Sequence, residues 1–212
     1  MTTHQGVQLF GTIIPKPNYT ARILYKDDAK EVDIRKLEPE ISEGIIAWIE
    51  LVFKQLEDSL NQAINILDRE ITTGQEADQP CHEQLPLRTR NIMVPFGRSA
   101  NQPIKQLTGA GIAARKRCIK DATNKITAIG PQKERLTFVL KDPSMISALD
   151  QEGITCLAGA IKTVIDDAVV SNWPEGDRSV KIYTLAVLRT LSDLANLRQA
   201  DLSRGTGNDK SR

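Results

Sequence analysis

The sequence predicts a mainly α protein of α+β type, a helical bundle with a small N-terminal antiparallel β-meander. Apolar residues recur every three or four positions through four long segments, which is the periodicity of amphipathic helices. The first 38 residues instead alternate apolar and polar residues between short polar turns, which is typical of antiparallel strands. Hydrophobic residues make up 40% of the 212 residues, enough for a packed core. We expect a β-meander annex at 1–38, a helical domain at 39–205 and a disordered tail at 206–212.

Three strands are expected in the annex. The first covers residues 7–14, and a proline-rich turn follows it at 15–18. The second covers residues 19–25 and the third covers 31–37, with a polar turn at 26–30 between them. Because so small a sheet is not stable alone, we expect it to pack against helices.

Pro39 stands in the first turn of the longest expected helix, a position that proline favours. The helical pattern continues to about Thr73, and Gly74 is suited to cap its C-terminal end. The apolar stripe is broad, so we expect a central bundle helix, with a dimer zipper as the alternative. A break near Ser59 or Asn61 is left open.

A long connector at residues 75–102, with three prolines, separates this helix from the next. Connectors of this length are usually functional or disordered. The next helix is expected at 104–129 and should end at Gly130-Pro131, because such pairs interrupt helices. Residues 136–140 fit either a strand or a short helix.

Two long helices, at 154–171 and 179–203, are expected to complete the bundle, after a short helix from Met145 to Leu149. Several positions on the apolar stripes should be buried in the core. They are Ile49, Val52, Leu56, Leu157, Ile161, Ile165, Leu188 and Leu191.

No motif of catalytic chemistry stands out, so we expect a protein that is not an enzyme and uses no cofactor or metal. Cys81, Cys118 and Cys156 are odd in number, widely spaced and without a CxxC pair, which argues against a disulfide framework or zinc module. Cys81-His82 could suggest a nucleophile beside its base, but sequence neighbours usually point apart. We interpret this pair as part of a polar loop whose role, if any, stays open.

The segment from Gly109 to Ala114 fits the pattern G-x-G-x-x-A, which in dinucleotide-binding proteins follows a buried strand. Residues 101–108 are too polar for such a strand, and the nearest suitable acid, Glu134, lies beyond the Gly130-Pro131 pair. We therefore interpret the glycines as the entry to a helix rather than as a cofactor site.

We expect no membrane segment and a cytoplasmic location. The longest apolar run, residues 44–53, is too short to span a bilayer and contains Glu50. The N-terminus has neither the basic region nor the apolar region of a signal peptide.

Charge is unevenly distributed although the net charge is only +1. Residues 1–87 hold eight basic and fifteen acidic side chains, whereas residues 88–141 hold twelve basic and two acidic ones. A block of net charge +10 attracts polyanions. Phosphate contacts need cations and not particular bases, so they predict binding without sequence preference. The candidate phosphate-binding residues are Arg88, Arg90, Arg98, Lys105, Arg115, Lys116, Arg117, Lys120 and Lys125.

These patterns predict a self-associating, sequence-nonspecific nucleic-acid-binding protein of nucleoprotein or coat type. The partner would be RNA or single-stranded DNA, bound through its phosphates, and the protein would be a homo-oligomer. In the alternative, the protein is a helical assembly or partner-docking protein without nucleic acid, and the basic block pairs with acidic faces. Glu43, Glu50 and Glu57 are acids that could neutralise the block in that case.

Overall fold

A computed structural model of the chain describes residues 17–25, 28–76, 87–96, 105–170 and 178–205. The fold is mainly α with a small antiparallel sheet, as the sequence predicts. Strand β1 (Thr20–Tyr25) pairs with β2 (Asp28–Asp33), and Thr20 lies opposite Asp33. The predicted strand at 7–14, the start of the connector and the predicted tail at 206–212 lie outside the described residues.

The predicted third strand, residues 31–37, is wrong beyond Asp33, where the chain enters the 3₁₀ helix η1 (Ile34–Lys36). Asp33 causes this change of direction, because its carboxylate caps η1 by accepting a hydrogen bond from the backbone N–H of Arg35. Its hydrogen bonds from the Arg35 side chain and backbone lower the pKa of Asp33 to about 2. Ile34 is buried and anchors the turn to the core.

Helix α1 (Pro39–Thr73) begins and ends where the sequence predicts. Gly74 adopts the left-handed conformation with φ of 68°, which glycine reaches without steric cost, and its N–H donates to the carbonyl of Ile71. The possible break near Ser59 or Asn61 does not occur. Ser59 is buried, and its hydroxyl donates to the Gln55 carbonyl within the continuous helix.

Helix α3 (Gly109–Lys141) begins at the glycine motif, with Thr108 as N-cap accepting from the N–H of Gly111. The predicted helix end at Gly130-Pro131 is wrong, because α3 continues through Pro131. Residues 136–140 are therefore helical, and Leu136 and Val139 are fully buried.

Shorter elements and two further long helices complete the chain. Residues 87–96 of the predicted connector form helix α2 (Leu87–Met93) and the 3₁₀ helix η3 (Val94–Phe96). The predicted short helix at 145–149 is the 3₁₀ helix η4 (Pro143–Ala148). Helices α4 (Gln151–Val170) and α5 (Arg178–Gly205) match the two predicted C-terminal helices within three residues at each end.

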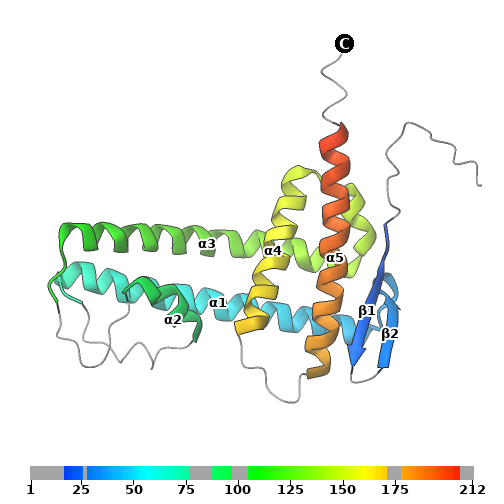
Figure 1. The fold of residues 1–212 in the computed structure, drawn as a ribbon, viewed down its shortest axis with the longest axis horizontal. Helices are drawn as coiled ribbons and strands as arrows, with labels where there is room; N and C mark the ends of the chain where they lie inside the picture. Colours follow the sequence, from blue (N-terminus) through cyan, green and yellow to red (C-terminus); the bar gives the residue numbers. More distant parts are fainter. Residues whose placement is uncertain (1–16, 26–27, 77–86, 97–104, 171–177, 206–212) are drawn as a thin grey trace, which may run out of the picture.

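Helices α1 and α3 run antiparallel and side by side, and both are about 50 Å long at 1.5 Å per residue (Figure 1). At one end they lie in a body formed with α4, α5 and the sheet (Figure 1). At the other end they project from this body together with α2 (Figure 1). We call this projection, residues 61–76, 87–96 and 105–125, the arm.

The buried apolar side chains form two clusters, one mainly in the body and a smaller one in the arm, and Ile92 packs against both. The body core draws on α1, α3, α4, α5 and the sheet, whereas the arm core is a small cluster of Ala63, Ile66, Leu67 and Met93. Six of the eight residues predicted to be buried are buried, and Leu56 and Ile165 are only half-buried. Leu56 is partly open because it lines a cleft between four helices.

Candidate nucleic-acid interface

Three of the predicted phosphate-binding residues, Lys116, Arg117 and Lys120, are exposed on the side of α3 that faces away from the core. Successive residues of a helix are rotated by 100° about its axis, so these three side chains lie opposite the buried Ala122 and Ile129. We call these three side chains the basic face.

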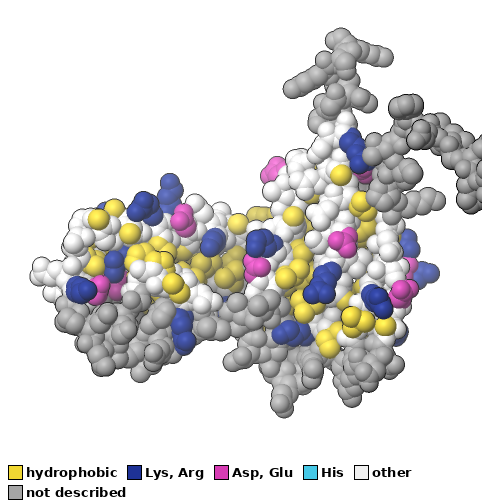
Figure 2. Space-filling view, viewed as in Figure 1, with side chains coloured by type: hydrophobic (Ala, Val, Ile, Leu, Met, Phe, Trp, Pro, Cys, Tyr) yellow, Lys and Arg dark blue, Asp and Glu magenta, His cyan; other side chains and the backbone are white. Residues whose placement is uncertain are grey.

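The basic face lies on the arm, away from the crowded body. Lys and Arg side chains lie along the upper edge of the arm, which α3 forms (Figure 2). Among the described residues, no carboxylate lies within ion-pair distance of Lys116, Arg117 or Lys120. Asp121 is exposed on the same helix, four positions after Arg117, so it reduces the positive charge of this region without forming an ion pair with the basic face.

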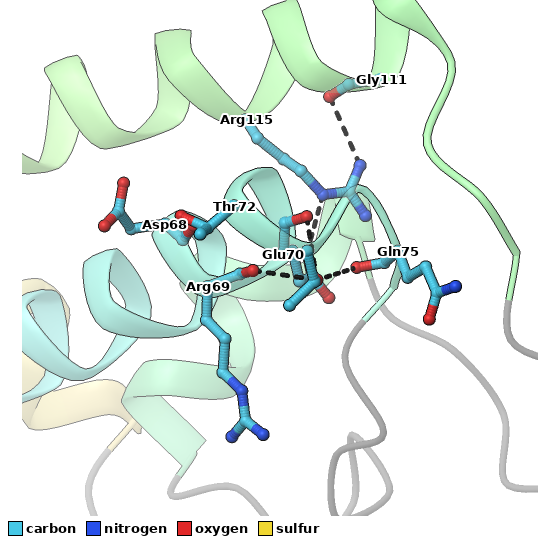
Figure 3. Close-up of polar contacts among 8 residues, drawn as sticks. Asp68, Arg69, Glu70, Thr72, Gln75, Gly111 and Arg115 are labelled. Atoms are coloured by element: carbon cyan, nitrogen blue, oxygen red, sulfur yellow. Dashed lines mark hydrogen bonds and ion pairs between the residues drawn. The ribbon is translucent and has the colours of Figure 1, made fainter.

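Arg115 does not belong to the basic face, although the sequence places it among the phosphate-binding residues. It is 5% exposed, and its Nε lies 2.7 Å from Oε2 of Glu70, which is also buried (Figure 3). Its Nη1 donates to the carbonyl of Gly111 at 3.4 Å, and its guanidinium lies 4.9 Å from the ring centre of Phe96. A guanidinium enclosed in this way is not available to a phosphate at the surface. We therefore leave Arg115 out of the residues proposed to contact phosphates.

Instead, Arg115 joins the parts of the arm. Glu70 belongs to α1, Gly111 to α3 and Phe96 to η3, so one side chain contacts three elements. The sequence analysis did not identify Glu70 as a buried partner of Arg115, although its position in the sequence indicates burial. It follows the buried Ile66 by four positions and Leu67 by three, and a carboxylate on an apolar stripe requires a partner.

The remaining predicted residues do not extend the basic face. Lys105 is exposed near the arm tip, where its carbonyl accepts from the N–H of Glu76. Arg88 and Arg90 are half-buried on α2, and Lys125 is exposed beside the cleft that Leu56 lines. Arg98 lies outside the described residues.

The described part of the chain contains two cysteines, and neither is activated as a nucleophile. Cys118 and Cys156 are half-buried, and burial raises the pKa of both thiols. Cys81 and His82 lie outside the described residues. Within the ranges that the structure describes, no three His, Cys, Asp or Glu side chains are grouped to hold a metal ion. The same ranges include no helix with the length and apolarity to cross a bilayer.

Comparisons with models of protein families, with curated proteins and with solved structures gave no match for this chain. The functional inferences that follow rest on the geometry, burial and charge of the residues described above.

Proposed function

We propose that the protein binds single-stranded nucleic acid, RNA or DNA, through phosphate contacts made by the basic face of α3. The observation that supports this function is the position of Lys116, Arg117 and Lys120 on one exposed side of a projecting arm, where they form no ion pair with a described carboxylate. Cations displace the counterions of a nucleic acid when they contact phosphates, and this release favours binding.

The chemistry of the face favours phosphate contact over reading of bases. Stacking on bases requires exposed aromatic rings, and Phe96 lies against Arg115 instead. Phe138 is 44% exposed but lies five helical turns from Lys120 along α3. We therefore expect binding to be insensitive to base sequence.

Replacing Lys116, Arg117 and Lys120 together with alanine tests this function. For about three phosphate contacts, the slope of log affinity against log salt on a single strand should be about −2 for the wild type. The variant should have a slope near zero and weaker binding to every oligonucleotide. The measurement is a fluorescence-anisotropy titration of labelled single strands of different sequence at several salt concentrations.

A matched control changes the net charge equally away from the basic face. Lys30, Lys36 and Lys54 are exposed on β2, η1 and α1, and their triple alanine variant should keep the wild-type slope. Equal losses in the two triple variants would show that net charge alone attracts the strand and would contradict the assignment to α3. Absence of salt-sensitive binding by the wild type at low salt would reject the function itself.

A second candidate function, assembly of copies through complementary charges, is favoured by the outer side of α1. Spacings of 7, 7 and 11 residues place four exposed acids on one side of this helix, with Lys54 as the exposed cation among them. We call these acids the acidic face: Glu43, Glu50, Glu57 and Asp68. The acidic face therefore lies on exposed α1 surface and the basic face on exposed α3 surface, so one copy carries both charges on different helices. Such surfaces suit head-to-tail contacts between copies.

Sedimentation of the wild type and of the variant Glu50→Lys/Glu57→Lys at low and high salt tests this assembly. We expect the wild type to associate at low salt and to dissociate as salt screens the charges. The charge-reversed variant should remain monomeric in both conditions. A wild type that is strictly monomeric at low salt, at tens of micromolar, would reject assembly while leaving phosphate binding untouched.

A further inference from the structure

The two long helices that carry the arm each have a weakened turn close to the body. In α3, Pro131 has no N–H, so the carbonyl of Thr127 lacks its usual helical donor. In α1, the hydroxyl of the buried Ser59 donates to the carbonyl of Gln55 at 2.7 Å, and such a bond slightly destabilises a helix. Both features are common where long helices bend. We call residues 55–59 and 127–131 the soft turns.

The two soft turns lie side by side. Arg115 of α3 contacts Glu70 of α1, and the two helices run in opposite directions at 1.5 Å per residue. Ile129 follows Arg115 by fourteen positions, about 21 Å along α3. Leu56 precedes Glu70 by the same number on α1, so it should lie opposite Ile129. Leu56 and Ile129 do line the same cleft, so both helices are weakened at one level of the structure.

Each side of this level is tied together internally. In the arm, the buried Arg115–Glu70 pair joins α3 to α1, and Thr89 of α2 donates to Oε1 of Gln62 of α1 at 2.8 Å. In the body, α4, α5 and the second half of α3 share the large hydrophobic cluster. Among the elements that the structure describes, only α1 and α3 continue from the arm into the body.

We propose that the arm pivots on the body at the soft turns, and that this motion opens and closes the cleft of about 500 Å³ beside them. Ile92 of α2 and Lys125 of α3 line the cleft from the arm side, whereas Asp166 of α4 lines it from the body side. Because the soft turns also contribute to the cleft, rotation at these turns changes the distance between its two sides.

The side chains of the cleft favour closure. Leu56 and Ile92 are half-buried, so closure removes more of their apolar surface from water. Ile92 already packs against both hydrophobic clusters, so closure extends an existing contact. Closure also brings the exposed Lys125 towards Asp166, which has the opposite charge. Asp166 is held by Lys162 of its own helix at 2.7 Å, but an exposed pair of this kind contributes little stability and is readily exchanged.

The pivot changes the direction of the basic face relative to the body. The basic face lies on the arm, so it turns with the arm while α4, α5 and the sheet stay in place. A pivoting arm could follow a single strand whose path varies from one bound copy to the next. This use of the pivot rests on the proposed nucleic-acid function, whereas the pivot itself does not.

Pulsed electron paramagnetic resonance on the full chain measures the pivot as a distribution of distances between two spin labels. The native cysteines are first replaced with serine: Cys81, Cys118 and Cys156. One label pair, Ala113→Cys with Ala158→Cys, joins an exposed site of the arm to an exposed site of α4. The control pair, Ala113→Cys with Asn65→Cys, lies within the arm. We expect a broad distribution for the arm–body pair and a narrow one for the pair within the arm.

Two variants that strengthen the soft turns should narrow the arm–body distribution towards the width of the control pair. Pro131→Ala restores an N–H donor to α3, and Ser59→Ala removes the hydroxyl bond within α1. Thr190→Ala is the matched control for Ser59→Ala. Both residues are 8% exposed, and the Thr190 hydroxyl makes the same type of bond, to the carbonyl of Ala186 in α5. This control should leave the distribution unchanged.

Charge reversal tests whether the cleft is what closes. Lys125→Glu places a like charge across the cleft from Asp166, so the shortest arm–body distances should be lost. Lys120→Glu makes the same change outside the cleft and should keep them. Adding Asp166→Lys to Lys125→Glu restores opposite charges across the cleft and should bring the shortest distances back.

Three results would overturn the proposal. An arm–body distribution as narrow as that of the control pair would show a rigid junction. Unchanged distributions in both Pro131→Ala and Ser59→Ala would exclude the soft turns as the pivot. Equal losses of short distances in Lys125→Glu and Lys120→Glu would contradict closure of the cleft. Thermal melting checks the fold of each variant, and a rigid arm that still binds single strands with salt sensitivity would reject only the pivot.

Discussion

Arg115→Ala is expected to lower the free energy of unfolding by about 3–5 kcal/mol, although arginine is ordinarily a surface residue. The change removes the guanidinium from Glu70, whose side chain is 5% exposed, and a buried carboxylate that loses its cationic partner is strongly destabilising. It also removes the contact with Phe96. Chemical denaturation followed by circular dichroism measures the loss.

The matched control is Lys116→Ala, one position away on the exposed side of α3. It should change stability by less than about 0.5 kcal/mol, because exposed side chains contribute little. The double variant Glu70→Met/Arg115→Met should lose much less than Arg115→Ala, since both charges leave the interior together. A loss below about 1 kcal/mol in Arg115→Ala would contradict the buried pair and make Arg115 a phosphate-binding candidate again.

The destabilisation in Arg115→Ala should be concentrated in the arm. Its core is small, and the Arg115–Glu70 pair lies beside it, joining α1, α3 and η3. The body core is much larger, so hydrogen exchange should accelerate in the arm before the body. The basic face depends on this joint for its fixed orientation, although Arg115 itself touches no phosphate in our proposal.

Local sequence signals predicted the features that depend on neighbouring residues. Pro39 and Gly74 fixed both ends of α1, because one suits the first turn and the other reaches the left-handed conformation. Helix geometry places Lys116, Arg117 and Lys120 on one side of α3. The same geometry held a signal about Arg115, which precedes the buried Ala122 by seven positions and Ile129 by fourteen. These spacings place it on the buried side of α3.

Contacts between segments far apart in the chain could not be predicted from the sequence. Glu70 is 45 positions from Arg115, and no local pattern pairs the two. The cleft that Leu56 lines is formed by side chains from four helices, so no local pattern predicted it. Helix α2 was assigned to a connector because its seven residues are too short for a clear periodicity.

The predicted end of α3 at Gly130-Pro131 was wrong because the rule that Gly-Pro pairs interrupt helices takes no account of how the residues after the pair pack. Proline disfavours a helical residue before it through a clash with that residue's Cβ, which Gly130 lacks. Pro131 is exposed, so water reaches this side of the helix, where the carbonyl of Thr127 lacks the usual N–H donor. Burial of Leu136, Val139 and Leu140 beyond the pair favours continuation of the helix.

Pro131→Ala is therefore expected to raise the free energy of unfolding by about 1–3 kcal/mol. Alanine restores the N–H donor and removes the ring, a gain of about 3 kcal/mol in a helix interior, offset by about 1 kcal/mol from the greater freedom of the unfolded chain. Thermal and urea denaturation measure the change.

A second substitution tests the cause. In the Pro131→Ala background, Gly130→Ala should add about 1 kcal/mol of stability, because alanine is the better helix former and its Cβ would meet no neighbouring atom within 4 Å. In the wild-type background the same change should give no gain or a loss, since the new Cβ would crowd the Pro131 ring. This sign difference is the signature of coupling between the two positions. Loss of stability in Pro131→Ala would show instead that α3 needs the proline at this position to pack its C-terminal half against α4.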